Sequence, residues 1–136
     1  LASSYKKLGL KDEEINAYHD LLEVNPKATT ALQNLGNAYV EREDYEKAVE
    51  HYSLALNYEP ENTDIRHNLA VVYLRMELYE ESASEYALAV ESDPANASAH
   101  NGLAICYYML KDFKSSKKHA LTAEKLGFKV DKKLLK

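Results

Sequence analysis

Residues 29–62 read TTALQNLGNAYVEREDYEKAVEHYSLALNYEPEN, and this stretch decides the fold of the 136-residue chain. Its proline, Pro60, lies midway between the two other prolines of the chain, Pro26 and Pro94, which sets a period of about 34 residues. Leucine and tyrosine columns keep the same period: Leu1, Leu35, Leu69 and Leu103, then Tyr5, Tyr39, Tyr73 and Tyr107. A sequence that matches itself at such a period predicts stacked repeats rather than a closed globule.

Each period holds two segments whose apolar residues recur at the spacing of an amphipathic helix, residues 29–42 and 45–58 in the stretch above. Two helices joined by a short turn are therefore expected in every repeat. Residues able to cap the free amides of a helix start precede these segments at Asp44, Asn62, Asn96 and Asp112. The sequence thus predicts an all-α chain.

The repeat also resembles a known family, the tetratricopeptide repeat (TPR). The residues that fall at the spacing of its signature are Leu35, Gly36, Tyr39, Ala48, Tyr52, Ala55 and Pro60. The resemblance covers nearly the whole chain and implies a right-handed superhelical array of antiparallel helix pairs. We expect a single array of about three and three-quarter repeats: a truncated repeat 1–28, repeats 29–62 and 63–96, a degenerate repeat 97–130, and a C-terminal capping turn 131–136.

The two ends of the chain differ in character. The chain begins without Met and inside a repeat, so we expect an excision from a longer protein, with any targeting signal or further domain upstream left open. At the other end, Gly127 suits a helix C-terminus in the left-handed conformation. The tail beyond it, with Phe128, Val130, Leu134 and Leu135, is expected to cover the last repeat as a natural end.

In proteins that resemble this chain, the first helix of each repeat lines a concave groove, so ligand contacts are sought there. Asn34 and Asn68 lie one period apart and should stack along such a groove, where their amides could pair with the backbone of an extended peptide. Gly102 ends this column in the last repeat, with Asn101 one position away. The alternative is that Asn here only caps or solvates the helix.

A second candidate feature is a run of apolar residues on the same faces, Val71, Leu74, Ile105, Tyr108 and Met109. An exposed apolar strip usually marks contact with another molecule. The alternative is that Tyr108 and Met109 pack against the tail or an adjacent helix. The predicted peptide-binding site therefore comprises Asn34, Asn37, His67, Asn68, Val71, Leu74, Asn101, Ile105 and Tyr108.

The resemblance also allows one known ligand mode to be tested, the clamp that some TPR proteins place on the C-terminal carboxylate of chaperones. Its positions are held here by Gln33, Asn37, Asn68, Ser98 and Gly102. All the basic members are missing, and a carboxylate needs that positive charge. We therefore expect neither the clamp nor a chaperone partner bound through it.

Signs of chemistry are absent from the sequence. The histidines lack metal-ligand spacing, although His67 and His100 are expected near the groove, and Cys106 is the only cysteine. The four glycines are isolated, so no phosphate loop is present. We expect no catalytic residue, cofactor or metal. The formal charge of −5 argues against nucleic acid, and no apolar run approaches the roughly 20 residues of a membrane span.

These patterns favour a scaffold that binds a peptide or segment of another protein. Two alternatives stay open: self-association into a homo-oligomer through the cut N-terminal edge and the basic C-terminal quarter, and the targeting segment of a larger enzyme. The lysines of residues 111–118 could contact an acidic partner, although a solvated helix face is preferred. The compartment is left open, with the cytoplasm favoured.

Overall fold

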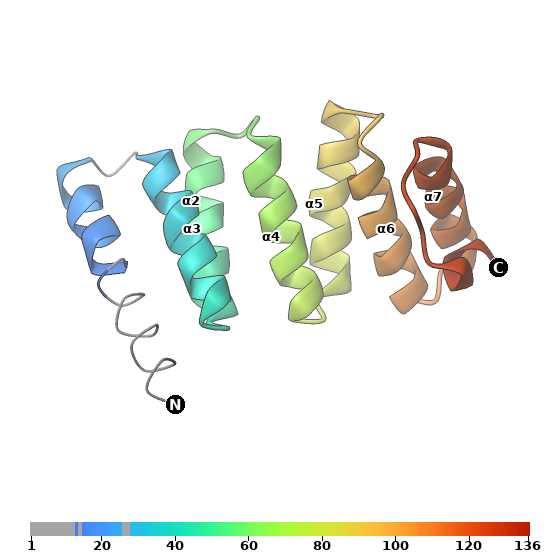
Figure 1. Ribbon diagram of the computed structural model, residues 1–136, viewed down its shortest axis with the longest axis horizontal. Helices are drawn as coiled ribbons and strands as arrows, with labels where there is room; N and C mark the ends of the chain where they lie inside the picture. Colours follow the sequence, from blue (N-terminus) through green and yellow to red (C-terminus); the bar gives the residue numbers. More distant parts are fainter. Residues whose placement is uncertain (1–12, 14, 26–27) are drawn as a thin grey trace. The chain divides into compact units, whose positions relative to one another are not determined.

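The computed structural model describes residues 13, 15–25 and 28–136, and within these ranges the regular structure is helical (Figure 1). This confirms the all-α prediction. The expectations for Leu1, Tyr5, Pro26 and most of the truncated repeat lie outside the described residues. None of the described helices is long and apolar enough to cross a membrane.

The chain forms two compact units, residues 1–60 and 61–136. The first contains a helical segment over residues 15–24 and then α2 (Thr29–Glu41) and α3 (Tyr45–Tyr58), which pack on each other. The second contains two helix pairs, α4 (Thr63–Arg75) with α5 (Tyr79–Ser92) and α6 (Ala97–Met109) with α7 (Phe113–Lys125), followed by the 3-10 turn η1 (Lys132–Leu135). The predicted helix pair at 29–42 and 45–58 is confirmed, with the first helix ending one residue early.

The turn inside each pair explains where the first helix ends. Glu43, Glu77 and Lys111 occupy the same position in successive repeats, and all three have positive φ angles, between 61° and 68°. The left-handed conformation costs a residue with a side chain about 1 kcal/mol, so these turns are held by the packing of the helices they join. Gly127 ends α7 with φ 93°, which confirms the expected left-handed glycine.

Three of the four predicted helix caps are confirmed. The side-chain oxygens of Asn62, Asn96 and Asp112 accept hydrogen bonds from the backbone amides three residues later, at 3.0–3.2 Å. Hydrogen bonds from the Ser115 side chain and amide hold the pKa of Asp112 below its usual value. The prediction for Asp44 is wrong: its side chain makes no cap hydrogen bond, and its carboxylate lies 3.9 Å from Lys47 Nζ.

The aromatic and small-residue columns form the cores of the two units. Tyr39, Tyr52 and Tyr86 are buried, and burial raises the pKa of Tyr52 to about 12. In the second unit the hydroxyls of Ser82 and Ser116 each donate a 2.8 Å hydrogen bond to a carbonyl of the facing helix. The small residues at these positions therefore bring the two helices of a pair close together.

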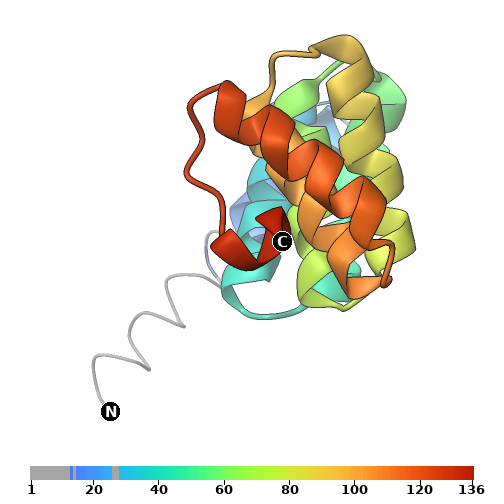
Figure 2. The ribbon, with the colours of Figure 1, turned by 90° about the vertical axis from the view of Figure 1, so that its right-hand side faces the viewer.

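The C-terminal tail turns back after α7 and ends in η1, which contacts both α6 and α7 (Figure 2). Leu134 is only 3% exposed and packs with Ala104 and Ala120, and Leu135 packs beside it. Phe128 and Val130 are half-buried. The expected cover of the last repeat is confirmed for Leu134 and Leu135, in the form of a 3-10 turn.

Candidate functional site

The most distinctive surface of the second unit is a cavity of about 220 Å³ between α6 and the tail, which we call the tail cleft. It is lined by Asn101, Ile105, Tyr108 and Met109 of α6 and by Lys129, Asp131, Lys133 and Leu134 of the tail. Three residues of the predicted site, Asn101, Ile105 and Tyr108, therefore lie together.

The apolar part of the tail cleft combines both interpretations of Tyr108. The Tyr108 ring stands edge-on to Phe113, with centroids 5.3 Å apart, and Lys133 Nζ lies 5.5 Å from its centre. Tyr108 and Ile105 also pack against the buried cluster around Leu134. Tyr108 thus packs on the tail, as the alternative held, and still presents part of its ring to the cleft, beside the half-exposed Met109.

A second cleft, of about 350 Å³, adjoins these residues. It is lined by Tyr108, Phe113, Ser116, Lys133, Leu134 and Lys136. Because Tyr108, Lys133 and Leu134 line both cavities, the tail turn forms a wall shared between them. Phe113 is 57% exposed, so this wall adjoins an uncovered aromatic ring.

One polar atom at the tail cleft is unsatisfied. Asn101 Oδ1 is buried and accepts no hydrogen bond from any described residue. Buried side-chain oxygens nearly always have a partner, and an unpaired one costs about 1–3 kcal/mol. Asn101, a residue that lines the tail cleft, therefore carries a buried acceptor without a donor.

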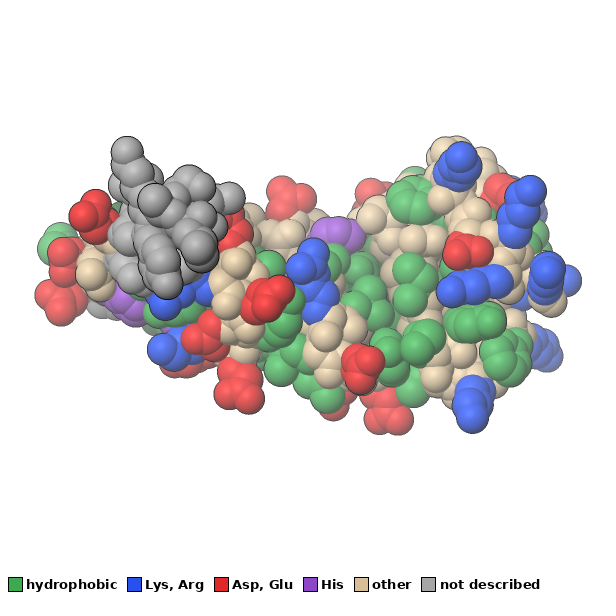
Figure 3. Space-filling model, turned by 60° about the horizontal axis from the view of Figure 1, so that its bottom comes forward, with side chains coloured by type: hydrophobic (Ala, Val, Ile, Leu, Met, Phe, Trp, Pro, Cys, Tyr) green, Lys and Arg blue, Asp and Glu red, His purple; other side chains and the backbone are tan. Residues whose placement is uncertain are grey.

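The charge around the tail cleft is positive. Residues 97–136 contain nine lysines and three acidic residues, a formal charge of +6, against nineteen acidic and eight basic residues, or −11, in residues 1–96. Helix α6 has no charged residue, and Asp131 accepts a 3.1 Å hydrogen bond from the Lys133 amide as the cap of η1. In Figure 3, hydrophobic side chains gather toward the C-terminal end of this face and basic side chains border them.

The predicted residues of α4 lie in a more covered setting. Val71 and Leu74 are half-buried and pack against a cluster that includes Ala70, Leu103 and Cys106. His67 stands edge-on to Tyr86, 5.7 Å between ring centres, and burial lowers the pKa of His67 while Asp64 acts in the opposite direction. Asn68 is half-buried.

The predicted residues of α2 belong to the first unit. Asn34 is half-buried, and Asn37 is exposed and accepts a hydrogen bond from the Tyr52 hydroxyl. The stacking of Asn34 with Asn68 stays a prediction. The end of that column at Gly102 has a steric reason, since a Cβ at Gly102 would lie inside van der Waals contact of the Tyr86 ring.

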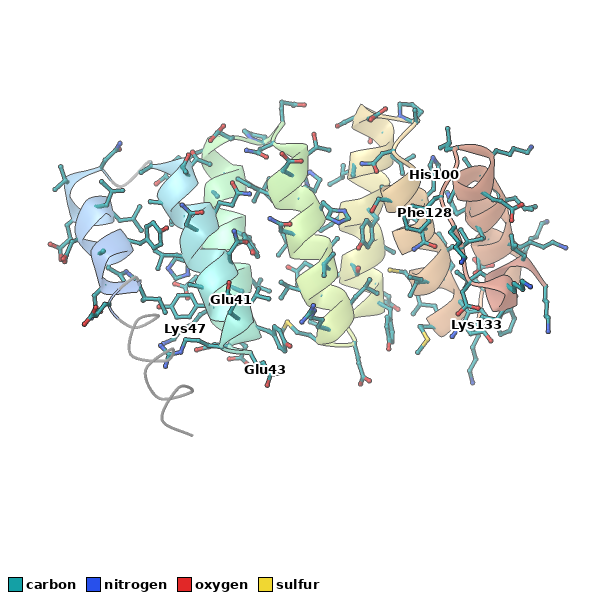
Figure 4. All side chains as sticks on the ribbon, in the orientation of Figure 1. Glu41, Glu43, Lys47, His100, Phe128 and Lys133 are labelled. Carbon is teal, nitrogen blue, oxygen red and sulfur yellow. The ribbon has the colours of Figure 1, made fainter. Side chains whose placement is uncertain are left out.

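His100 is not a groove residue, contrary to expectation. It is 7% exposed and lies between α6 and α7 (Figure 4). Its Nε2–H donates to the Pro94 carbonyl at 2.9 Å, so its Nδ1 must accept the 3.1 Å hydrogen bond from His119 Nδ1–H. Burial, His100 and Lys118 together lower the pKa of His119. The described residues contain no group of three side chains suited to a metal ion.

Comparison with known proteins places this geometry in a family. A TPR-repeat model matches residues 36–77 and a tetratricopeptide-repeat model matches residues 67–116. Among solved structures, the Sgt2 TPR domain from Aspergillus fumigatus is 27% identical with a TM-score of 0.71, covering 79% of this chain and 74% of that one. No curated protein sequence matches.

Two further solved structures agree in fold at lower identity. MamA is 15% identical, with a TM-score of 0.82 over 93% of this chain and 74% of its own. The first TPR of Spaghetti (RPAP3), bound to an HSP90 peptide, is 22% identical, with a TM-score of 0.69 over 73% of this chain and 79% of its own. The chain belongs to the tetratricopeptide-repeat family, whose arrays are protein–protein interaction modules.

Proposed function

We propose that this chain binds a segment of a partner protein along the faces of its first helices and that it catalyses no reaction. The observation that carries the proposal is the tail cleft. There an uncovered apolar surface on α6 adjoins a buried amide oxygen that lacks a donor. A bound peptide would cover this surface with an apolar side chain and, once the Asn101 amide turns toward the cleft, would offer a backbone N–H to its oxygen.

The other predicted residues offer further contacts, those of α4 within the second unit and those of α2 within the first. Asn68 and His67 on α4 offer a polar edge, while Val71 and Leu74 show only part of their side chains. On α2, Asn34 is available for a peptide backbone, whereas the oxygen of Asn37 already accepts from Tyr52. Amides suit this role because one side chain both donates and accepts.

Two neighbours support a peptide as the ligand. The first TPR of Spaghetti is described as bound to an HSP90 peptide, and YrrB, 21% identical with a TM-score of 0.78, as a TPR protein with an unusual peptide-binding site. TPR arrays generally act as scaffolds without catalysis. The likeness in fold therefore favours a peptide-binding surface as the interpretation of the α6 face.

The proposal is tested with a partner captured by the full-length protein, identified by mass spectrometry and then purified. Calorimetry should show binding weakened about 3- to 10-fold by Asn101→Ala, since one hydrogen bond contributes about 0.5–1.5 kcal/mol. The same variant should leave the melting temperature unchanged or raise it, because it removes a buried unpaired oxygen. Asn34→Ala with Asn68→Ala should also weaken binding.

The matched control is Asn57→Ala, an exposed amide on α3 outside the predicted site. Equal affinities for the wild type, Asn101→Ala and the Asn34/Asn68 double variant would refute the proposal. A variant that weakens binding and also lowers the melting temperature has a folding defect and does not test the site. The test then rests on Asn101→Ala, whose melting temperature we expect not to fall.

A further inference from the structure

We infer that the tail cleft is a subsite for an acidic segment of a partner protein, which inserts one apolar side chain between α6 and the tail. The inference deepens the proposed function and rests on it. It differs from the chaperone clamp in two ways: the basic residues come from the tail beyond Gly127, and a free C-terminal carboxylate has no part in recognition.

The size and lining of the tail cleft suit a single apolar side chain. At about 220 Å³ it is smaller than the roughly 300–1,000 Å³ of pockets for drug-sized ligands. Ile105, Tyr108, Met109 and Leu134 supply its apolar surface. Burying apolar surface contributes about 25 cal/mol of binding free energy per Å². A leucine side chain therefore contributes more to binding in this cleft than an alanine does.

The charges at the tail cleft select the flanking residues. Lys129 and Lys133 line it, and Lys136 lines the adjoining cleft. The carboxylate of Asp131 lies 4.0 Å from Lys133 Nζ and offsets one of these charges in part. With no charged residue on α6 to oppose them, the lysines favour carboxylates on both sides of the inserted side chain.

The unpaired oxygen of Asn101 fixes what the backbone of the segment must offer. Oδ1 is buried as the side chain stands, so the Asn101 amide must turn toward the tail cleft to accept a donor, and the donor nearest to any inserted side chain of a peptide is a backbone N–H. This need separates a peptide from a nucleic acid, whose phosphates would also be drawn to lysines but which offers neither an aliphatic side chain nor this amide donor.

The inference is tested with four fluorescein-labelled heptapeptides, all with amidated C-termini. The reference is EDELEDE, and the others replace its leucine by alanine, replace its acidic residues by Gln and Asn, or carry an N-methylated leucine. Fluorescence anisotropy should show each of the three binding about tenfold or more weaker than the reference. Amide shifts in the NMR spectrum of the labelled protein should concentrate on α6 and residues 128–136.

Matched variants separate the tail cleft from general charge. Lys129→Gln with Lys133→Gln should weaken EDELEDE binding about tenfold, whereas Lys117→Gln with Lys125→Gln, two exposed lysines of α7, removes the same charge and should change it less than about threefold. Raising the salt concentration from about 50 to about 500 mM should weaken binding to the wild type. A free C-terminal carboxylate on the peptide should make no difference.

Several outcomes would overturn the inference. They are equal binding of the acidic and amide peptides, equal effects of the two lysine pairs, shifts located elsewhere, and no binding of EDELEDE at millimolar concentration. Self-association that Lys129→Gln with Lys133→Gln abolishes would instead assign the tail cleft to a second copy, whose residues 1–96 are acidic. If Asn34→Ala with Asn68→Ala weakens binding of the captured partner and Lys129→Gln with Lys133→Gln does not, this inference fails while the proposed function stands.

Discussion

The two helix pairs of the second unit have the same backbone plan and different chemistry at one shared position. Asn62 and Asn96 cap their first helices alike, and Ser82 and Ser116 make the same hydrogen bond. Where α4 and α5 are joined by a 2.8 Å ion pair, Arg66 to Glu85, α6 and α7 are joined one period later by the stacked imidazoles of His100 and His119. The repeat therefore dictates geometry and leaves the link within each pair free to vary.

The two pairs also differ in what covers them. Helix α5 packs against α6 of the next pair, whereas the tail takes that place after α7. A short 3-10 turn covers less surface than a helix pair. Two clefts lie around Tyr108, where the tail meets the C-terminal pair.

The largest expected effect comes from removing that cover. Leu134→Ala should lower the free energy of unfolding by about 2–3 kcal/mol, because the leucine is 3% exposed and its loss leaves a cavity beside Ala104 and Ala120. Urea denaturation followed by circular dichroism measures the change. Leu126→Ala, at a leucine that is 42% exposed, is the control and should cost less than about 1 kcal/mol. Equal effects would show that the tail does not stabilise the last pair.

A smaller effect tests the joint between the two pairs. In Gly102→Ala the new Cβ would meet the buried Tyr86 ring, and such overpacking costs about 1–3 kcal/mol. The gain in helix propensity from glycine to alanine offsets up to about 1 kcal/mol, so we expect a net loss of about 1–2 kcal/mol. Ser98→Ala, at an exposed site of α6, should change stability by no more than about 0.5 kcal/mol. A more stable Gly102→Ala variant would contradict the close packing of α5 on α6.

Much of this fold follows from the repeat period alone. Residues inside the period repeat their surroundings, so the helices, the caps at Asn62, Asn96 and Asp112, and the buried tyrosines could be predicted. The lack of a cap at Asp44 could not be predicted, because an Asp before a helix can equally face a nearby lysine, here Lys47. The positive φ angles at Glu43, Glu77 and Lys111 carry no sequence signal, since glycine, the usual marker, is absent there.

The site was predictable only in part. Helical spacing on α6 brought Ile105 and Tyr108 together correctly, with Asn101 one turn earlier. Lys129 and Lys133 were missed, because they lie in the tail beyond Gly127 and only tertiary packing decides the path of the tail. His100 was misplaced because its position in the repeat is held by Arg66 in the previous pair, and nothing in the period shows that an imidazole there turns toward the next helix.

The smallest effect concerns the links themselves, and pH reveals it. The unfolded chain binds a proton at His119 near pH 6.5, whereas burial, His100 and Lys118 lower the pKa of His119 in the folded unit. Between the two pKa values the unfolded state holds more protons. The contribution of His119 to the free energy of unfolding is therefore fully present above about pH 6.5. It declines as the pH falls through that value, until His119 of the folded state also binds a proton.

Copying the ion pair into the last pair should remove this dependence. In His100→Arg with His119→Glu, the link would copy the ion pair of Arg66 with Glu85, and it would contain no imidazole. Urea unfolding at pH 5, 6 and 7 should show a smaller loss of stability on acidification than in the wild type. His67→Gln is the necessary control, because burial also lowers the pKa of His67 and adds to the same slope. If the slope of unfolding free energy against pH is unchanged in the double variant and flatter in His67→Gln, then His67 on α4, and not the pair of His100 and His119, causes the pH dependence.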